Sequence, residues 1–210
     1  MAEILAISPE KPEPQLIERA VELLRRGEVV GVPTDTRYGL AADPFNLAAV
    51  ARLYQIKGRP ERRALPILIA SIDQAEELVS DLPDIFFHLA KRFWPGPLTL
   101  VVDASRRVPL KVTGNTGRVA LRIPRAEIPC ALINALGTPV TGTSANLSGF
   151  SACLDAGQVV EQLGERLPLI LDGGASKTRL ASTVVDLRGE QWRILREGPI
   201  GEGEIQEVLS

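Results

Sequence analysis

Residues 28–40 read "EVVGVPTDTRYGL", in which a short apolar strand ends at Pro33 and passes directly into a polar segment. Because proline has no backbone N–H to offer a sheet, we expect the strand to stop there. The polar segment begins with Thr34, Asp35 and Thr36, whose side chains can all form hydrogen bonds. Two interpretations are open: these side chains form one wall of a binding site, or they only satisfy their own backbone in a capped turn.

Helices and strands are expected to alternate on both sides of this segment. The stretch "PQLIERAVELLRRG" (14–27) places its apolar residues on one helical face, with proline at its start and glycine at its end. The next helix, in "NLAAVARLYQIKG" (46–58), can be capped by Asn46. Because the later strands come close together in sequence, we predict an α/β fold in which helices flank one twisted mixed β-sheet. Further helices are expected at about 71–82, 84–93, 127–136 and 203–210, and further strands at 65–70, within 94–104 and 117–124, and at 167–172, 182–187 and 192–197.

The composition fits one large domain, residues 1–210, better than two small ones. The chain has 210 residues, of which 45% are hydrophobic and 24% are charged. It contains no run of about 18 apolar residues, and its N-terminus lacks a basic region followed by an apolar run. We therefore expect a cytoplasmic protein with no membrane segment. The formal net charge of −2 disfavours a protein that binds nucleic acid non-specifically.

Residues that commonly bind metals or act as bases are scarce. Cys130 and Cys153 have no second Cys or His near either of them, so we expect buried free thiols rather than a zinc site or a disulfide. The one histidine, His88, has apolar neighbours in "DIFFHLAKRF" and is expected to have a packing or surface role. We expect no metal site built by the protein, and chemistry that does not use imidazole.

Three segments are candidates for binding an anion. "KGRPERR" (57–63) is rich in cations and "RVALRIPR" (118–125) contains three arginines, although a cationic run is often only a solvated face. "TGTSANLSG" (141–149) offers small residues, hydroxyls and an amide, which suit phosphate or nucleoside binding but also serve in ordinary turns. The sequence has neither a G-x-G-x-x-G nor a P-loop motif, so ATP would have to bind by another design.

The polar segments at 33–39, 57–63 and 142–149 each follow the end of a predicted strand or helix. In open α/β sheets, ligands bind beyond the carboxyl ends of the strands. We therefore expect these three segments to converge on one crevice.

Eight short motifs occur in one order along the chain: "PTDTRYGL", "KGRP", "WPGPLTLV", "LRIP", "TSANLSG", "LDGG", "STVVDL" and "LREGPI". In this respect the chain resembles the YrdC family, the threonylcarbamoyl-AMP synthases, from about residue 15 to 205. The resemblance implies a YrdC-like single domain, a twisted α/β sheet whose concave face holds the ligand site. The chain ends soon after this core, so it is expected to be the short bacterial form.

The resemblance also implies an enzyme, a nucleotidyltransferase that uses L-threonine, bicarbonate and ATP. Its products are threonylcarbamoyl-adenylate and pyrophosphate, and the adenylate feeds threonylcarbamoyladenosine modification of tRNA. Downstream tRNA threonylcarbamoyl transferase proteins are therefore expected partners, and weak RNA binding is possible. No organic cofactor is implied, and Mg²⁺ is expected to be carried by the ATP. Because a carbamate must attack the α-phosphate, the site needs fixed cations and donors more than a strong base.

Site residues follow from the resemblance by matching each motif. The residues implied in catalysis are Lys57, Arg59, Ser144 and Asn146. The residues implied in ATP binding are these four together with Arg63 and Arg196. The residues implied in L-threonine binding are Thr36, Arg122, which would meet the carboxylate, and Ser182.

Several positions depart from the family pattern, and two other functions stay open. Arg63 and Leu68 stand where many long-form members have Asn and His, and "TRLA" (178–181) lacks the glycine that usually precedes Ser182. Arg37 stands where many members have a small apolar residue, so it could reach the ligand or lie on the rim. A catalytically inactive paralogue that binds double-stranded RNA is disfavoured by the net charge and by the retention of Lys57, Arg59, Ser144 and Asn146 together. An enzyme that forms carbamoyl-adenylate is disfavoured by a chain with no partner domain.

Overall fold

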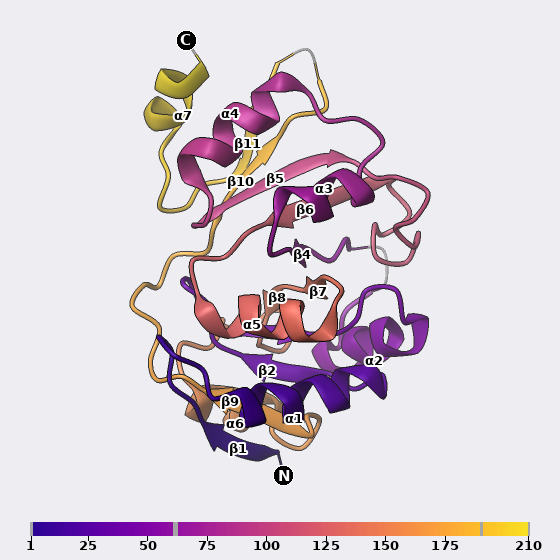
Figure 1. Ribbon diagram of the computed structural model, residues 1–210, viewed down its shortest axis with the longest axis vertical. Helices are drawn as coiled ribbons and strands as arrows, with labels where there is room; N and C mark the ends of the chain where they lie inside the picture. Colours follow the sequence, from indigo (N-terminus) through magenta and orange to yellow (C-terminus); the bar gives the residue numbers. More distant parts are fainter. Residues whose placement is uncertain (1, 61–62, 190, 210) are drawn as a thin grey trace.

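The computed structural model describes residues 2–60, 63–189 and 191–209, and its strands form two sheets (Figure 1). The five-stranded sheet has the spatial order β1 (Glu3–Ala6), β9 (Leu169–Asp172), β2 (Val30–Val32), β3 (Gly39–Ala41) and β8 (Thr143–Ser144). The six-stranded sheet has the order β11 (Arg193–Arg196), β10 (Thr183–Asp186), β5 (Leu98–Asp103), β6 (Arg118–Arg122), β4 (Ile67–Leu68) and β7 (Val140–Thr141).

Both sheets are mixed, which confirms the predicted α/β class with a mixed sheet. In the first sheet, β9 runs parallel to β1 and β2, whereas β3 is antiparallel to β2 and β8. In the second sheet, β10 runs parallel to β5 and β4 to β6, and the other pairs are antiparallel. The sequence patterns predicted one sheet and did not reveal this division into two.

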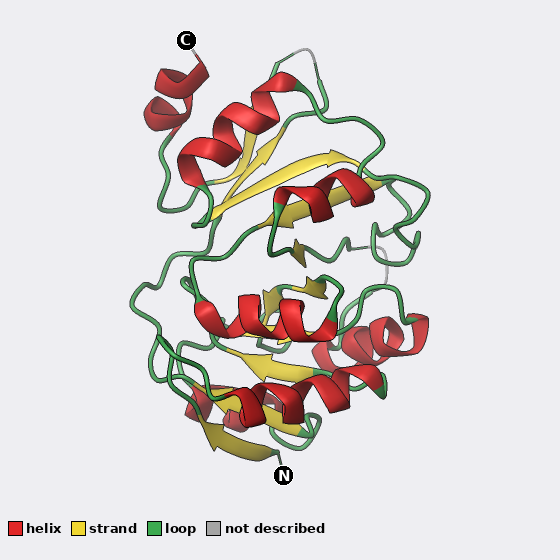
Figure 2. Ribbon diagram, in the orientation of Figure 1, coloured by secondary structure: helices red, strands yellow, loops and turns green. Residues whose placement is uncertain are grey.

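The helices lie over the two sheets (Figure 2). They are α1 (Pro14–Arg25), α2 (Leu47–Lys57), α3 (Ile72–Leu78), α4 (Asp84–Phe93), α5 (Glu127–Leu136), α6 (Ala156–Leu163) and α7 (Glu202–Leu209). Apolar residues of α1 and α5 pack with those of β2 and β9, so these two helices cover one face of the five-stranded sheet. Within the described ranges, no helix has the length and apolar character needed to cross a membrane.

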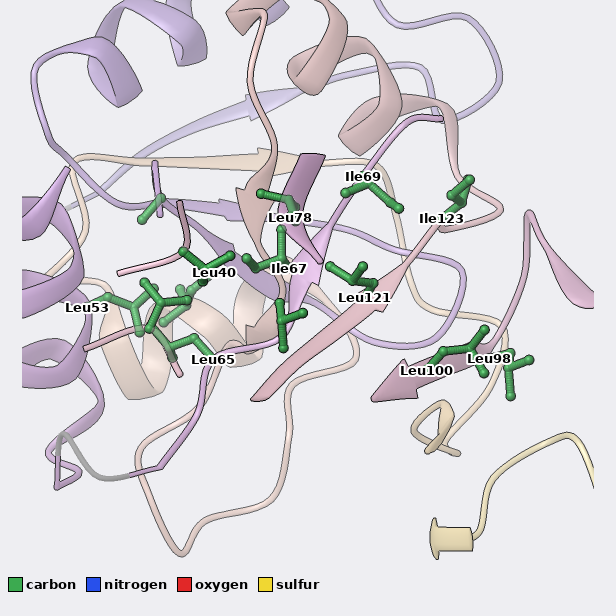
Figure 3. Packing of buried hydrophobic residues seen from close by; sticks show 14 of the residues in the cluster. Leu40, Leu53, Leu65, Ile67, Ile69, Leu78, Leu98, Leu100, Leu121 and Ile123 are labelled. Carbon is green, nitrogen blue, oxygen red and sulfur yellow. The ribbon is translucent and has the colours of Figure 1, made fainter. Parts of the chain in front are cut away.

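One hydrophobic core joins the two sheets. A single cluster of buried residues contains Leu40 of β3, Leu53 of α2, Ile67 of β4 and Leu121 of β6. Figure 3 shows these side chains gathered where the sheets approach each other. Each such buried side chain contributes about 1.5–3 kcal/mol relative to exposure. The two sheets are therefore held together by apolar packing as well as by the chain.

The chain crosses between the sheets at two places that matter for the site. β7 and β8 belong to different sheets and are separated only by Gly142, where an added Cβ would lie 2.6 Å from Cγ of Leu68. The second crossing is the irregular segment 173–182, which leads from β9 to β10. Polar residues carried by these crossings consequently lie between the sheets.

Most of the predicted elements are present, and the differences are in short elements. Asn46 caps α2, since its Oδ1 accepts hydrogen bonds from the N–H groups of Ala48 (3.1 Å) and Ala49 (3.2 Å). The strands β1, β3, β7 and β8 and the helix α6 were not predicted. β1 is largely exposed and forms because its backbone pairs with β9, an interaction that leaves no periodic pattern in the sequence. Residues 61 and 62 of the cationic run and residue 210 of the predicted last helix lie outside the described ranges.

Candidate functional site

A cavity of about 340 Å³ lies between the two sheets. Residues of β3 and β8 line it from one sheet, and residues of β4, β5, β6, β10 and β11 line it from the other. The predicted convergence of the segments 33–39, 57–63 and 142–149 is confirmed, because each contributes lining residues. The cavity therefore forms where the chain crosses from one sheet to the other.

The cavity is strongly cationic. Its described lining includes five arginines and no Asp or Glu, although the whole chain has a formal net charge of −2. The five are Arg37, Arg59, Arg63, Arg122 and Arg196. Fixed guanidinium groups in a partly enclosed space favour ligands with several negative charges, above all phosphates and carboxylates. Several hydroxyl groups complete the polar lining, namely those of Thr34, Thr36, Tyr38, Thr99, Thr143, Ser144 and Ser182.

Both interpretations of the opening segment hold, each for a different side chain. Thr34 satisfies its own turn, since its Oγ1 accepts from the N–H groups of Thr36 (3.1 Å) and Arg37 (3.2 Å) and donates to the Arg37 carbonyl (2.7 Å). Thr36 lies beside it with Oγ1 at 3.0 Å from that of Thr34 and lines the cavity. The capped turn thus fixes the position of a residue that faces the site.

Asp35 forms an ion pair with Arg122 across 87 residues of sequence. Nη2 of Arg122 donates to Oδ1 of Asp35 at 2.6 Å, and the two side chains are only 7% and 12% exposed. The same guanidinium donates through Nη1 to Oγ1 of Thr36 (3.1 Å) and through Nε to the Gly96 carbonyl (2.9 Å). Three acceptors therefore hold Arg122 against the cavity wall. One of them is Thr36, which was also predicted to bind L-threonine.

Lys57 lies behind the wall rather than in it. Its Nζ donates to the carbonyls of Ser144 (2.5 Å) and Asn146 (3.0 Å), and its side chain is buried. Burial, and secondly the positive charge of Arg59, lower the pKa of Lys57 to about 8. Lys57 therefore fastens α2 to the segment that carries Ser144.

Asn146 also lies behind Ser144. Oγ of Ser144 donates to Oδ1 of Asn146 at 2.5 Å, and Nδ2 of Asn146 donates to the carbonyls of Leu147 (2.7 Å) and Phe150 (2.8 Å). The amide thus orients the Ser144 hydroxyl and fixes the turn that follows. Lys57, Ser144 and Asn146 form one connected group, and only Ser144 of the three is part of the cavity lining.

Arg59 lines the cavity and is held mainly by the chain segment that follows it. Its Nη2 donates to the carbonyls of Arg63 (2.7 Å) and Ala64 (2.8 Å), its Nη1 lies 3.5 Å from Oγ1 of Thr143, and its guanidinium carbon lies 5.5 Å from the ring centre of Tyr54. Its Nε is buried and has no hydrogen-bond partner among the described residues. Burial lowers the pKa of Arg59 from its ordinary value, but a guanidinium stays charged at neutral pH.

Ser182 and Arg196 form the opposite end of the cavity. Arg196 donates from Nη2 to the Ser182 hydroxyl (2.9 Å) and carbonyl (2.8 Å), and the Ser182 hydroxyl lies 2.8 Å from that of Thr99. Burial lowers the pKa of Arg196, and the nearby charges of Arg37 and Arg122 lower it further. Three cations are therefore close to one another at this end.

Seven of the nine predicted site residues line the cavity, and Lys57 and Asn146 stand one layer behind it. Thr99 lines the cavity but was not predicted, although its hydroxyl is the only one in the apolar strand "LTLVV". Thr143, within the polar segment 141–149, also lines the cavity and had no predicted role. The lining residues with polar side chains that the resemblance did not assign are Thr34, Arg37, Tyr38, Thr99 and Thr143.

No thiol or imidazole of the described residues is part of the cavity lining. Cys130 and Cys153 are free; Cys153 is buried as expected, whereas Cys130 is only partly buried. His88 is exposed on α4, in agreement with a surface role. Within the described residues, no group of three or more His, Cys, Asp or Glu side chains is placed to hold a metal ion.

Comparison with known proteins connects this geometry to one family. A family profile described as "Telomere recombination" (Sua5, YciO, YrdC) matches residues 22–198. The chain is 40% identical over 200 residues to the threonylcarbamoyl-AMP synthase of Pyrococcus abyssi, covering 95% of this chain and 59% of that protein. It is 39% identical over 193 residues to the putative threonylcarbamoyl-AMP synthase of Mycobacterium tuberculosis, covering 92% and 88% of the two chains.

A solved structure agrees with these sequence matches. The crystal structure of P. abyssi Sua5 complexed with L-threonine superimposes with a TM-score of 0.96 at 39% identity, covering 99% of this chain and 61% of that one. The chain thus spans about three fifths of the length of the Pyrococcus protein. The resemblance inferred from the eight motifs is confirmed: the chain belongs to the Sua5/YciO/YrdC family.

Proposed function

We propose that this protein is a threonylcarbamoyl-AMP synthase, a nucleotidyltransferase that joins L-threonine, bicarbonate and ATP into threonylcarbamoyl-adenylate and pyrophosphate. The observation that carries the proposal is the cavity between the sheets, which presents five arginines, several hydroxyls and no described carboxylate. Such a lining suits a reaction that brings a triphosphate, a carboxylate and a carbamate together. The identity to curated synthases over most of the chain supports this choice of reaction.

ATP and L-threonine are proposed to occupy neighbouring parts of the cavity. The ATP phosphates would lie against Arg59, Arg63 and Ser144, where forked guanidinium contacts are available. Lys57 would add positive charge from behind Ser144, and Asn146 would orient the Ser144 hydroxyl. Arg196 would contact the nucleotide from the other side.

L-Threonine would bind at Thr36, Arg122 and Ser182. Arg122 is already held by Asp35 and the Gly96 carbonyl, and it keeps N–H groups that no described residue accepts. A threonine carboxylate could take up these donors. The Ser182 and Thr36 hydroxyls would meet the remaining polar groups of the amino acid.

The reaction then proceeds by two bond-forming steps. The threonine amine attacks the carbon of bicarbonate or CO₂, and a carbamate forms with loss of water or of a proton. A carbamate oxygen attacks the α-phosphorus, the bond to the β-phosphate breaks, and pyrophosphate leaves with the electron pair. Because developing charge is spread over phosphate oxygens, the fixed arginines stabilise this step. Mg²⁺ would enter as part of the ATP substrate, and the proposed downstream partners are the tRNA threonylcarbamoyl transferase proteins.

Pyrophosphate release and mass spectrometry of the nucleotide product test the proposal. The complete mixture of Mg·ATP, L-threonine and bicarbonate should release pyrophosphate and yield threonylcarbamoyl-adenylate, and omission of either threonine or bicarbonate should abolish both. An Arg59→Met variant should lose most of the activity. Turnover with carbamoyl phosphate in place of threonine and bicarbonate would support the carbamoyl-adenylate reaction instead, and no turnover by the folded protein would refute the synthase.

A further inference from the structure

Arg37 lines the cavity, and its backbone is fixed by a hydrogen-bonded turn. Its N–H donates to the Thr34 hydroxyl (3.2 Å), and its carbonyl accepts from the same hydroxyl (2.7 Å). Tyr38, the next residue, is fully buried and donates from its hydroxyl to the Gly174 carbonyl (2.8 Å). The Arg37 side chain therefore leaves from a rigid turn and lines the cavity in a defined place.

The Arg37 guanidinium is anchored by a neutral group. Nε donates to the carbonyl of Arg179 at 2.9 Å, and Nη2 donates to the same oxygen. Arg179 belongs to the segment 173–182 that crosses from one sheet to the other. A guanidinium has five N–H donors, so this contact leaves both donors of Nη1 and one of Nη2 available. Among the described residues, no carboxylate lies within ion-pair distance of Arg37 to compensate its charge.

The same form of anchoring is found in two neighbouring arginines. Arg122 donates from Nε to the Gly96 carbonyl, and Arg196 donates from Nε to the Ser182 carbonyl (3.0 Å). Carbonyl anchors orient a guanidinium without neutralising it. Of these three arginines, only Arg122 has a described carboxylate partner, Asp35, which leaves two unpaired positive charges at one end of the cavity.

Such a cluster is costly without a ligand. Burial lowers the pKa of Arg196, and the charges of Arg37 and Arg122, both close to it, lower that pKa further. Like charges gathered in a partly buried site repel one another, and the arrangement becomes favourable when an anion binds between them. The oriented, unneutralised fork of Arg37 is the feature expected of a residue that binds an oxyanion.

We propose that Arg37 is a further substrate-binding residue, which binds an oxyanion of the substrates together with Arg122 and Arg196. The inference rests on the proposed synthase function, which supplies two sources of that oxyanion, the carboxylate end of threonine and a phosphate of ATP. The Arg179 carbonyl sets the orientation of the fork, and the segment 173–182 thereby becomes part of the substrate site.

Isothermal titration calorimetry with L-threonine and, separately, with Mg·ATP tests this role. Loss of a hydrogen-bonded charge costs about 1.5–3 kcal/mol, so Arg37→Met should weaken binding of one of these substrates by about 10- to 150-fold. Arg37→Lys should lose less, because it keeps the charge but not the fork. The matched control is Arg179→Met, which removes an exposed cation whose side chain is not part of the described cavity lining and leaves the anchoring carbonyl in place. It should change either dissociation constant less than twofold.

The outcomes separate the two proposals. A wild-type protein that binds neither substrate would overturn the synthase function itself. If the wild type binds both substrates and the dissociation constants of Arg37→Met agree with those of Arg179→Met within twofold, the role of Arg37 is refuted. The proposed synthase function is then unaffected. The substrate whose binding is weakened identifies the source of the oxyanion. If Arg37→Met fails to fold, Arg37→Gln takes its place, because it keeps a donor to the Arg179 carbonyl but has no charge. The proposal then requires that Arg37→Gln weaken substrate binding at least as much as Arg37→Lys does.

Discussion

Replacing Asp35 with asparagine should lower the free energy of unfolding by about 1.5–3 kcal/mol, because it removes the charged partner of Arg122. The two side chains are joined at 2.6 Å and are 7% and 12% exposed, so the pair is nearly buried. Breaking a fully buried ion pair from one side costs about 3–5 kcal/mol. The cost here should be smaller, since Arg122 keeps its bonds to Thr36 and Gly96 and faces a cavity that water can enter.

Urea denaturation at neutral pH, followed by circular dichroism, measures this change. For a chain of this size, 1 kcal/mol corresponds to about 2–4 °C in Tm, so the expected loss of about 1.5–3 kcal/mol should also lower Tm by about 3–12 °C. Asp103→Asn is the matched control, because Asp103 is 63% exposed and lies 3.9 Å from Arg188. An exposed pair of this kind contributes little, and the control should change stability by less than about 0.5 kcal/mol.

The result that would contradict this reasoning is an Asp35→Asn variant no less stable than Asp103→Asn. It would mean that the Asp35 contact at 2.6 Å contributes nothing that Thr36 and Gly96 do not already supply. The positioning of Arg122 in the proposed threonine site would then have to be assigned to those two partners alone.

Three further predictions concern neighbouring groups. The pKa of Lys57 falls to about 8 on folding, so the unfolded state binds more protons between about pH 8 and the ordinary lysine pKa of 10.5. The free energy of unfolding should therefore rise with pH across that range, by up to about 3 kcal/mol. Urea denaturation at several pH values measures this rise, which the Lys57→Met variant should lose. Arg59→Lys keeps the charge but not the fork, so pyrophosphate release should fall by about 10- to 100-fold, and undiminished activity would contradict a forked phosphate contact. Gly142→Ala should destabilise the protein by about 1–3 kcal/mol, because the added Cβ would lie 2.6 Å from Cγ of Leu68. The control Gly203→Ala on α7 has open space around the added Cβ and should be neutral or stabilising. Equal Tm values for the two variants would refute this packing argument.

The elements that the sequence predicted well are those whose residues reveal burial or capping locally. α5 was predicted at 127–136 and is found at Glu127–Leu136, and the Asn46 cap is present as expected. The strands β7 and β8 contain two residues each, too few for a periodic pattern, so the division into two sheets at Gly142 could not be inferred. β1 depends on backbone pairing with β9, more than 160 residues away, and the sequence carries no sign of that partner.

The site was predicted as a set of residues, and its layering was not. The resemblance selected Lys57, Ser144 and Asn146 together, and the structure brings them together. Motif matching carries no information about which of the three faces the cavity, because that depends on how α2 packs against the segment after β8. The pairing of Asp35 with Arg122 is likewise a tertiary contact, and it neutralises a cation that the sequence presented as free.

The position of the cavity links substrate binding to the joining of the two sheets. Its lining comes from both sheets, and the crossings at Gly142 and at residues 173–182 carry Thr143, Ser144 and Ser182 into it. Arg196 belongs to β11 of the six-stranded sheet, and Arg59 lies with its Nη1 3.5 Å from Thr143 of β8 in the five-stranded sheet. A polyanionic ligand that contacts both arginines adds attraction across the junction. Before the ligand binds, the same arginines repel one another there, and the shared apolar core around Leu40, Ile67 and Leu121 must hold the sheets together against that repulsion. The junction is therefore the part of the fold whose stability should respond most strongly to the substrates.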